Sequence, residues 1–124
     1  MLRAMQEAGI RSFVATSKPQ VHAEAICRKF GIVPYVEAIA GPAVGGTDTK
    51  ADVMRRILAG LGPLQPGDAV MVGDRRFDVI GAHELGLPVI YVTYGYGDEA
   101  ERKAFQPDYT AATVADLKRL LLQA

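Results

Sequence analysis

Two aspartates, Asp74 and Asp78, have the residue type and the spacing of a metal site. Asp74 follows the apolar run 69–73, which predicts a buried parallel strand that ends at Gly73. Asp78 lies four residues later, on the same face of the helix expected to start there. Two carboxylates at the carboxyl edge of an open α/β sheet suit a hard cation such as Mg²⁺, so both are predicted metal ligands. The alternative for Asp74 is a structural role as a helix cap.

Hydroxyl and amine groups that follow an earlier apolar strand form a second candidate site. Thr16, Ser17 and Lys18 come at the end of the run 12–16, directly before a helix whose first amides attract anions. Lys50 opens another helix and could neutralise phosphate oxygens as a point charge. These four residues are predicted to bind phosphate, with the metal clamping the phosphoryl group between them. The alternative is that such Thr and Lys residues cap helices or face solvent.

Short apolar stretches alternate with amphipathic stretches along the chain. Strands are expected over 12–16, 36–40, 69–73, 89–93 and 109–111. Helices are expected over 2–8, 19–30, 50–61, 75–85, 98–105 and 114–121. The alternation is typical of an α/β fold with a doubly wound parallel sheet, in which the loops after the strands gather at one edge. The length suits a single domain, residues 1–124.

Individual residues also predict helix boundaries and buried faces. Thr49 has the character of an N-cap, with Asp52 at the third helical position completing a capping box. The apolar residues expected to form the buried face of the helix over 19–30 are Val21, Ala25 and Ile26. His22 and His83 lie on predicted helices without a further ligand nearby in sequence, so neither is a predicted metal ligand.

The composition is that of a soluble globular protein, with 49% apolar and 23% charged residues. Fourteen basic residues balance fourteen acidic ones without a basic stripe, so no nucleic-acid partner is expected. No apolar run reaches membrane-spanning length, so no membrane partner is expected. The single cysteine, Cys27, is expected in the core, and its use fits a reducing, cytoplasmic location.

Three motifs occur in a characteristic order: V-A-T-S-K-P at 14–19, K-A-D-V at 50–53 and G-D-x-x-x-D at 73–78. This order resembles the haloacid dehalogenase (HAD) superfamily of phosphatases, and most closely its phosphoglycolate phosphatase and 5′-nucleotidase-like branch. Gly41, the Gly46-Thr47 pair and the stretch 93–97 have counterparts in that branch as well. The resemblance extends over essentially the whole chain.

The resemblance implies a HAD-like α/β core that acts as a Mg²⁺-dependent phosphomonoester phosphatase, a phosphoric monoester hydrolase. It implies a small phosphorylated metabolite as substrate and Mg²⁺ as cofactor. Thr16 would bind the phosphate, and Lys50 would be a catalytic residue that stabilises both phosphate and nucleophile. Asp74 and Asp78 would anchor Mg²⁺ directly or through water.

One part of the family pattern is missing. The family begins with a strand ending in Asp-x-Asp-x-Thr, whose first Asp is the nucleophile and whose second is the general acid and base. These 124 residues contain no such motif. The chain is therefore expected to be the C-terminal part of a core domain without its first strand and its substrate-selecting cap, and to be inactive alone. Residues 12–16 and 69–73 flank that strand in the family, and an open gap between them is not expected, because unpaired buried backbone groups cost about 1–3 kcal/mol each. Direct pairing of the two segments is the favoured outcome, and the alternatives are a strand supplied by another molecule or a partly ordered sheet.

Two other functions compete with an incomplete phosphatase. One is a non-catalytic protein that keeps the phosphate and metal half-site, or a pseudoenzyme completed by a partner chain. Homo-oligomer formation or strand complementation would supply that partner. The other is a receiver-type phosphorylation domain, but a receiver places its acidic residues first and its Lys last, whereas Thr16 and Lys50 precede Asp74 here. The substrate cannot be identified without the cap.

Overall fold

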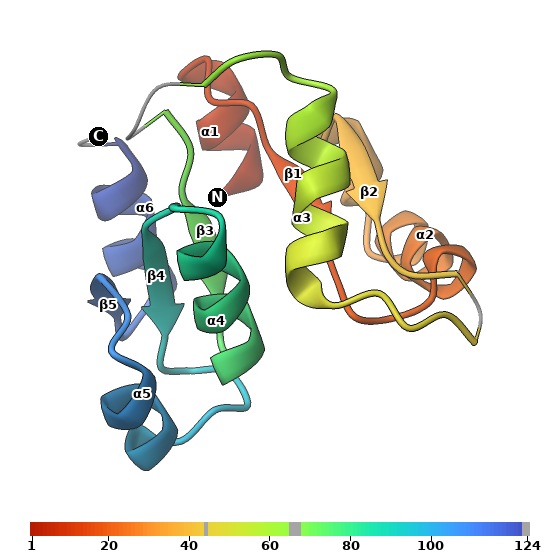
Figure 1. Cartoon of the computed structure of the whole chain (residues 1–124). Coiled ribbons are helices and arrows are strands. Elements are labelled where there is room, and N and C mark those ends of the chain that lie inside the picture. Colours follow the sequence, from red (N-terminus) through yellow and green to blue (C-terminus); the bar gives the residue numbers. More distant parts are fainter. Residues whose placement is uncertain (44, 65–67, 123–124) are drawn as a thin grey trace. The chain divides into compact units, whose positions relative to one another are not determined.

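The computed structural model describes residues 1–43, 45–64 and 68–122 (Figure 1). The chain divides into two compact units, Met1–Leu61 and Gly62–Ala124, and each is described by itself. Both units are α/β, with parallel strands, as the sequence predicts. Each predicted strand and helix is present within a few residues of its expected bounds. That both units belong to one incomplete core domain over 1–124 stays a prediction.

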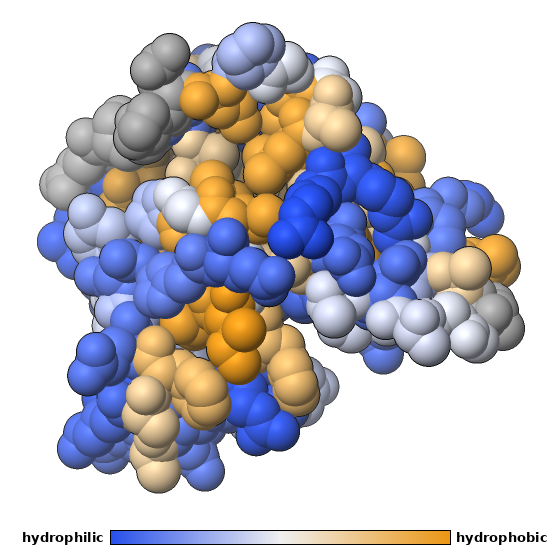
Figure 2. All heavy atoms as spheres, viewed as in Figure 1, coloured by the Kyte–Doolittle hydropathy of each residue, from blue (hydrophilic) through white to orange (hydrophobic). Residues whose placement is uncertain are grey.

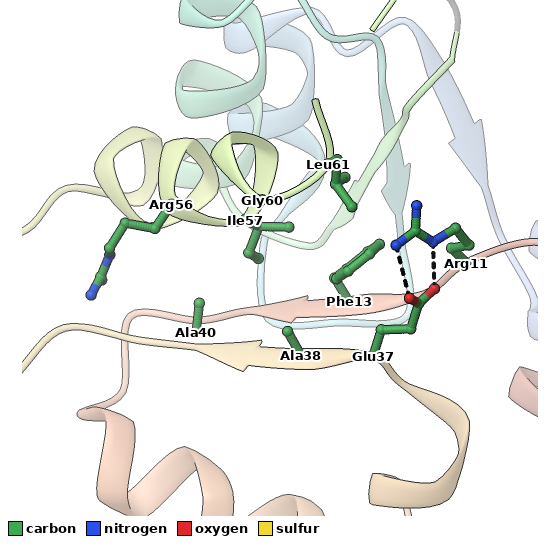
Figure 3. Close-up of a pocket in the computed structure, with 9 residues that line it drawn as sticks. All are labelled: Arg11, Phe13, Glu37, Ala38, Ala40, Arg56, Ile57, Gly60 and Leu61. Atoms are coloured by element: carbon green, nitrogen blue, oxygen red, sulfur yellow. Dashed lines mark hydrogen bonds and ion pairs between the residues drawn. The ribbon is translucent and has the colours of Figure 1, made fainter. Parts of the chain in front are cut away.

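The first unit is built on a two-stranded parallel sheet. Its elements are α1 (Leu2–Glu7), β1 (Phe13–Ala15), α2 (Gln20–Lys29), the 3-10 helix η1 (Val33–Tyr35), β2 (Ala38–Ala40) and α3 (Lys50–Ala59). Val14 of β1 lies opposite Ile39 of β2. Helices α3 and α2 cover opposite faces of this sheet, as Figure 3 shows. The sequence pattern does not predict η1.

The second unit is built on a three-stranded parallel sheet in the order β3-β4-β5. Its elements are β3 (Met71–Gly73), α4 (Arg76–Glu84), β4 (Val89–Val92), α5 (Glu99–Phe105), β5 (Tyr109–Ala111) and α6 (Val114–Leu122). Val89 and Tyr91 of β4 pack with Val79 and Ala82 on one face of the sheet. Ile90 and Val92 pack with Ala111 and Leu117 on the other. Because successive side chains alternate between faces, the continuous apolar run of β4 is buried on both sides.

The predicted direct pairing of residues 12–16 with 69–73 would join the two units and stays a prediction. Within the part of the chain that the structure describes, β1 pairs with β2 and β3 pairs with β4, in two separate sheets. Strands β1 and β3 are therefore both edge strands of their own sheets. Unpaired backbone groups are costly only when they are buried. On an edge strand they can form hydrogen bonds to water or to another chain.

The predicted buried face of α2 is also wrong. Val21 is 64% exposed and Ile26 is 38% exposed, whereas Ala23 and Cys27 are buried. The first turn of α2 is tied to the neighbouring strand β2. Gln20 donates its Nε2 to the Ile39 carbonyl at 2.6 Å, and the helix packs on β2 with its small residues Ala23 and Cys27 buried.

Hydrophilic (blue) and hydrophobic (orange) residues both reach the surface in the view of Figure 2. No helix in the described ranges is long and apolar enough to cross a membrane.

The capping box at the start of α3 is present as predicted. Asp52 N–H donates to the Thr49 hydroxyl at 3.2 Å, and Thr49 N–H donates to the Asp52 carboxylate at 2.9 Å.

Candidate functional site

Thr16 lies at the carboxyl end of β1, where the chain turns toward α2. Its N–H donates to the Ala40 carbonyl at 3.0 Å, which extends the strand ladder by one residue. Its hydroxyl oxygen accepts the Lys18 N–H at 3.1 Å and thereby closes a tight turn. The Lys18 amide is thus engaged, but the hydroxyl proton of Thr16 remains available to a ligand. The side chains of Ser17 and Lys18 are exposed on this turn.

Lys50 is brought to the same strand end although it lies far away in sequence. It is the first residue of α3, and its ammonium donates to the Ala15 carbonyl at 3.3 Å. Backbone groups of successive strand residues point to alternate edges, and Thr16 points toward β2 through its bond to Ala40. The Ala15 carbonyl therefore points to the edge of β1 that β2 does not use. The structure thus places the positive charge of Lys50 at that free edge, beside Thr16.

The loop after β2 is tied to this strand end by residues that sequence reasoning missed. Gln20 accepts the Gly41 N–H at 2.8 Å, and Arg56 of α3 donates to the Gly41 carbonyl at 3.0 Å. A Cβ at Gly41 would collide with the Lys18 carbonyl, so only glycine allows this close approach of the two loops. Gly41 itself is the one sequence signal for the contact.

Asp74 occupies the corresponding place in the second unit, directly after β3. Its carboxylate Oδ2 accepts the Tyr96 N–H at 2.9 Å, and its main-chain carbonyl accepts the Gly97 N–H at 2.9 Å. A Cβ at Gly95 would overlap the Asp74 side chain, so the glycine permits the loop to wrap around the carboxylate. No hydrogen bond to Asp74 Oδ1 is present among the described residues. One carboxylate oxygen thus fixes the side chain, and the other can bind a cation.

Asp78 is buried at the start of α4, only 5% exposed. Its Oδ2 accepts the main-chain N–H of Asp74 at 3.1 Å and that of Arg75 at 3.2 Å. A Cβ at Gly73 would collide with the Asp78 carboxyl group, which explains the glycine at the end of β3. Asp78 therefore orients the backbone of Asp74. A role beside the cation is compatible with this geometry through a bound water.

Helix α5 secures the start of α4 through a residue that sequence reasoning also missed. Glu101 accepts the Arg76 N–H at 2.8 Å and forms an ion pair with Arg75 at 3.3 Å. Asp98 caps α5 by accepting the Glu101 N–H at 2.7 Å. The loop 94–97 lies between these anchors and β4, so both its ends are held. The only sequence signal was a short charged helix, which does not distinguish Glu101 from its neighbours.

The donor set of the second unit fits a hydrated hard cation. Mg²⁺ keeps several waters and is commonly held by one or two carboxylates. The described residues contain no group of three or more His, Cys, Asp and Glu side chains that could hold a metal ion. Asp74 with one uncommitted oxygen, oriented by Asp78, supplies the small donor set that such a cation needs. His83 has another role, because its Nε2 lies 2.8 Å from the Asp108 carboxylate.

A cavity of about 310 Å³ lies in the first unit between α3 and its sheet (Figure 3). An ion pair of Arg11 with Glu37, 2.7 Å between Nε and Oε2, borders it and lowers the pKa of the Glu37 carboxyl. Its remaining lining residues are Phe13, Ala38, Ala40, Arg56, Ile57, Gly60 and Leu61. The predicted phosphate-binding residues do not line this cavity, so it is a separate feature.

The fold and these motifs can now be compared with known proteins. A family model described as HAD-hydrolase-like matches residues 49–117, which is more than half of the chain. The chain belongs to the HAD-hydrolase-like family. The resemblance found in the sequence motifs is thereby confirmed.

Individual relatives match almost the whole chain. A 5′-nucleotidase from Pseudomonas aeruginosa is 38% identical over 122 residues, which are 98% of this chain and 55% of the relative. The tyrosine-protein kinase PtkA from Mycobacterium tuberculosis is 40% identical over 124 residues, 98% of this chain and 42% of that protein. The crystal structure of a predicted phosphatase from Clostridium acetobutylicum has a TM-score of 0.92 at 38% identity, covering 99% of this chain and 57% of its own. The chain spans about half the length of the relatives it matches.

Proposed function

We propose that this protein provides the phosphate- and metal-binding part of a Mg²⁺-dependent phosphomonoester phosphatase. The observation that carries the proposal is Asp74, which has one uncommitted carboxylate oxygen at the carboxyl end of a parallel strand. Similarity to a 5′-nucleotidase and to a phosphatase structure supports this class of reaction. The substrate class that follows is a small phosphorylated metabolite.

Each proposed role follows from the chemistry of the side chain. Thr16 donates its hydroxyl proton to a phosphate oxygen, with Ser17 and Lys18 on the same turn. The Lys50 ammonium neutralises charge on the phosphoryl group, which makes it the catalytic residue of this chain. Asp74 binds Mg²⁺ and Asp78 orients Asp74, with contact to the cation through water. When bound, Mg²⁺ supplies positive charge to the transferring phosphoryl oxygens.

The reaction also needs a nucleophile, which we propose comes on an added strand. The free edge of β1 carries the Ala15 carbonyl and the Lys50 ammonium. A strand that pairs parallel to β1 at this edge would end beside Lys50 and Thr16. A carboxylate at that end would be near both phosphate-binding groups, and Lys50 would stabilise its negative charge. The strand would come from another segment of the same protein, a second copy or another chain.

The test is turnover of p-nitrophenyl phosphate with Mg²⁺. The isolated chain is expected to show no enzymatic rate, since loss of a nucleophile removes orders of magnitude in rate. Co-expression with a peptide that carries an apolar strand ending in Asp-x-Asp-x-Thr should restore turnover, and Lys50→Gln or Asp74→Asn should abolish it. Robust turnover by the isolated chain, lost on mutation of one of its own residues, would place a nucleophile within these residues instead.

A second candidate is a non-catalytic protein that binds phosphate and Mg²⁺ without hydrolysis. Thr16, Lys50 and Asp74 need no nucleophile to bind phosphate or a cation, which is what this candidate rests on. Failure of every added strand to restore turnover, with phosphate and Mg²⁺ binding intact, would select this function. For either function we propose a reducing cytoplasmic location, which the free, buried Cys27 supports.

A further inference from the structure

The Tyr91 hydroxyl is an unusual buried group in the second unit. The residue is 1% exposed, and its hydroxyl is the one buried side-chain polar atom without a hydrogen-bond partner in the part of the chain that the structure describes. Burial of an unpartnered hydroxyl costs stability. Phenylalanine would fill nearly the same space without that cost. The oxygen therefore requires an explanation other than packing.

The position of this hydroxyl connects it to Asp74. A Cβ placed on Gly97 would overlap both the Tyr91 hydroxyl oxygen and the Asp74 carbonyl oxygen, so both atoms lie against the same small α-carbon. Gly97 also donates its N–H to that Asp74 carbonyl. Tyr96, one residue earlier, donates its N–H to the Asp74 carboxylate. The phenol oxygen is thus in contact with the turn whose two amides hold Asp74.

The surroundings keep the Tyr91 hydroxyl protonated. Burial raises its pKa, and the negative charges of Glu101, Asp74 and Asp98 raise it further, while Arg75 acts in the opposite direction. The group is therefore a neutral O–H donor at neutral pH. Among the described residues the hydroxyl makes no hydrogen bond, so it acts on Gly97 and the Asp74 carbonyl through packing contact.

We propose that Tyr91 is a positioning residue for Asp74. Its hydroxyl oxygen packs against Gly97, and this contact keeps the Asp74 carboxylate in the orientation that binds a hydrated divalent cation. Stability is given up for this orientation, as is common where a side chain serves a site. The inference rests on the proposed metal role of Asp74.

The test combines Mg²⁺ titration with chemical unfolding in three variants. The amide resonances of Tyr96 and Gly97 report Mg²⁺ binding by NMR. Tyr91→Phe removes the oxygen that contacts Gly97 and should weaken Mg²⁺ binding about three- to tenfold, while its unfolding midpoint stays equal to wild type or rises. Tyr109→Phe, a half-exposed tyrosine on the neighbouring strand, is the matched control and should bind Mg²⁺ as wild type does. Asp74→Asn should lose most of the binding.

A double variant tests the contact itself. Gly97→Ala introduces a methyl group where the Tyr91 oxygen lies and should weaken Mg²⁺ binding, and the loss should be smaller when Tyr91→Phe is also present. Wild-type Mg²⁺ affinity in Tyr91→Phe, or a lower unfolding midpoint in that variant, would overturn the positioning role. Wild-type affinity in Asp74→Asn would overturn the metal role as well, which separates failure of the inference from failure of the proposed function.

Discussion

The buried carboxylate of Asp78 accepts the main-chain N–H of Asp74 at 3.1 Å. A second bond from Arg75 N–H at 3.2 Å goes to the same oxygen. One buried side chain therefore fixes the backbone at which β3 ends and α4 begins. The two aspartates share a motif but differ in their contacts. Asp78 Oδ2 accepts two main-chain N–H groups, whereas Asp74 Oδ2 accepts one, and its Oδ1 accepts none among the described residues.

This difference predicts opposite effects for two substitutions. Asp78→Ala leaves two N–H groups without their acceptor and should lower the free energy of unfolding by about 2 kcal/mol. Asp74→Asn keeps an acceptor for Tyr96 and should change stability little, yet it should lose Mg²⁺ binding. Urea unfolding and Mg²⁺ titration by NMR measure the two effects. Equal stability losses in both variants would contradict the division of roles.

Lys50 is expected to dominate phosphate binding in the first unit. Lys50→Gln removes the ammonium beside Ala15 and should weaken binding of inorganic phosphate severalfold. Lys118→Gln, an exposed lysine on α6, is the charge-matched control and should have no effect beyond screening. Phosphate titration followed by NMR gives both affinities. If the two variants lose the same affinity, phosphate binding depends on net charge rather than on this site.

The capping box should measurably stabilise α3. Thr49→Ala removes the acceptor for the Asp52 N–H and should cost about 1 kcal/mol in the free energy of unfolding. The nearby exposed Thr47→Ala is the control and should be neutral. Urea denaturation midpoints provide the comparison. A neutral Thr49→Ala would show that tertiary packing, not the cap, determines where α3 begins.

Asp108 should make the stability of the second unit sensitive to acid. Hydrogen bonds from His83 and from the Val89 N–H lower the pKa of its carboxyl below the usual value. A lowered folded-state pKa adds stability that is complete above the unfolded-state value of about 3.9 and is lost as the pH falls through the folded-state value. Unfolding free energies of wild type and Asp108→Asn should therefore differ at pH 6 and converge toward pH 2. A difference that does not change with pH would exclude this linkage.

The alternating pattern of the chain was sufficient to predict its strands and α-helices, though not the 3-10 helix η1. Runs such as 89–92 are apolar and β-branched, and they are bounded by Gly and Pro, so strand and helix bounds follow from local chemistry. The motif residues were found in the same way, because Gly73, Asp74 and Asp78 act over one strand end and one helical turn. The Thr49–Asp52 cap is equally local.

Long-range contacts were decided only in the folded chain. Nothing near Gln20 in sequence shows that its amide will bond to Ile39, or that α2 will bury Ala23 and Cys27 rather than Val21 and Ile26. Likewise, in the sequence Tyr91 resembles the other residues of its strand. Only the structure shows that its hydroxyl is buried against Gly97 without a hydrogen-bond partner among the described residues. Local patterns determine which backbone groups bond nearby, whereas the partners of a side chain depend on segments that meet only after the sheet has formed.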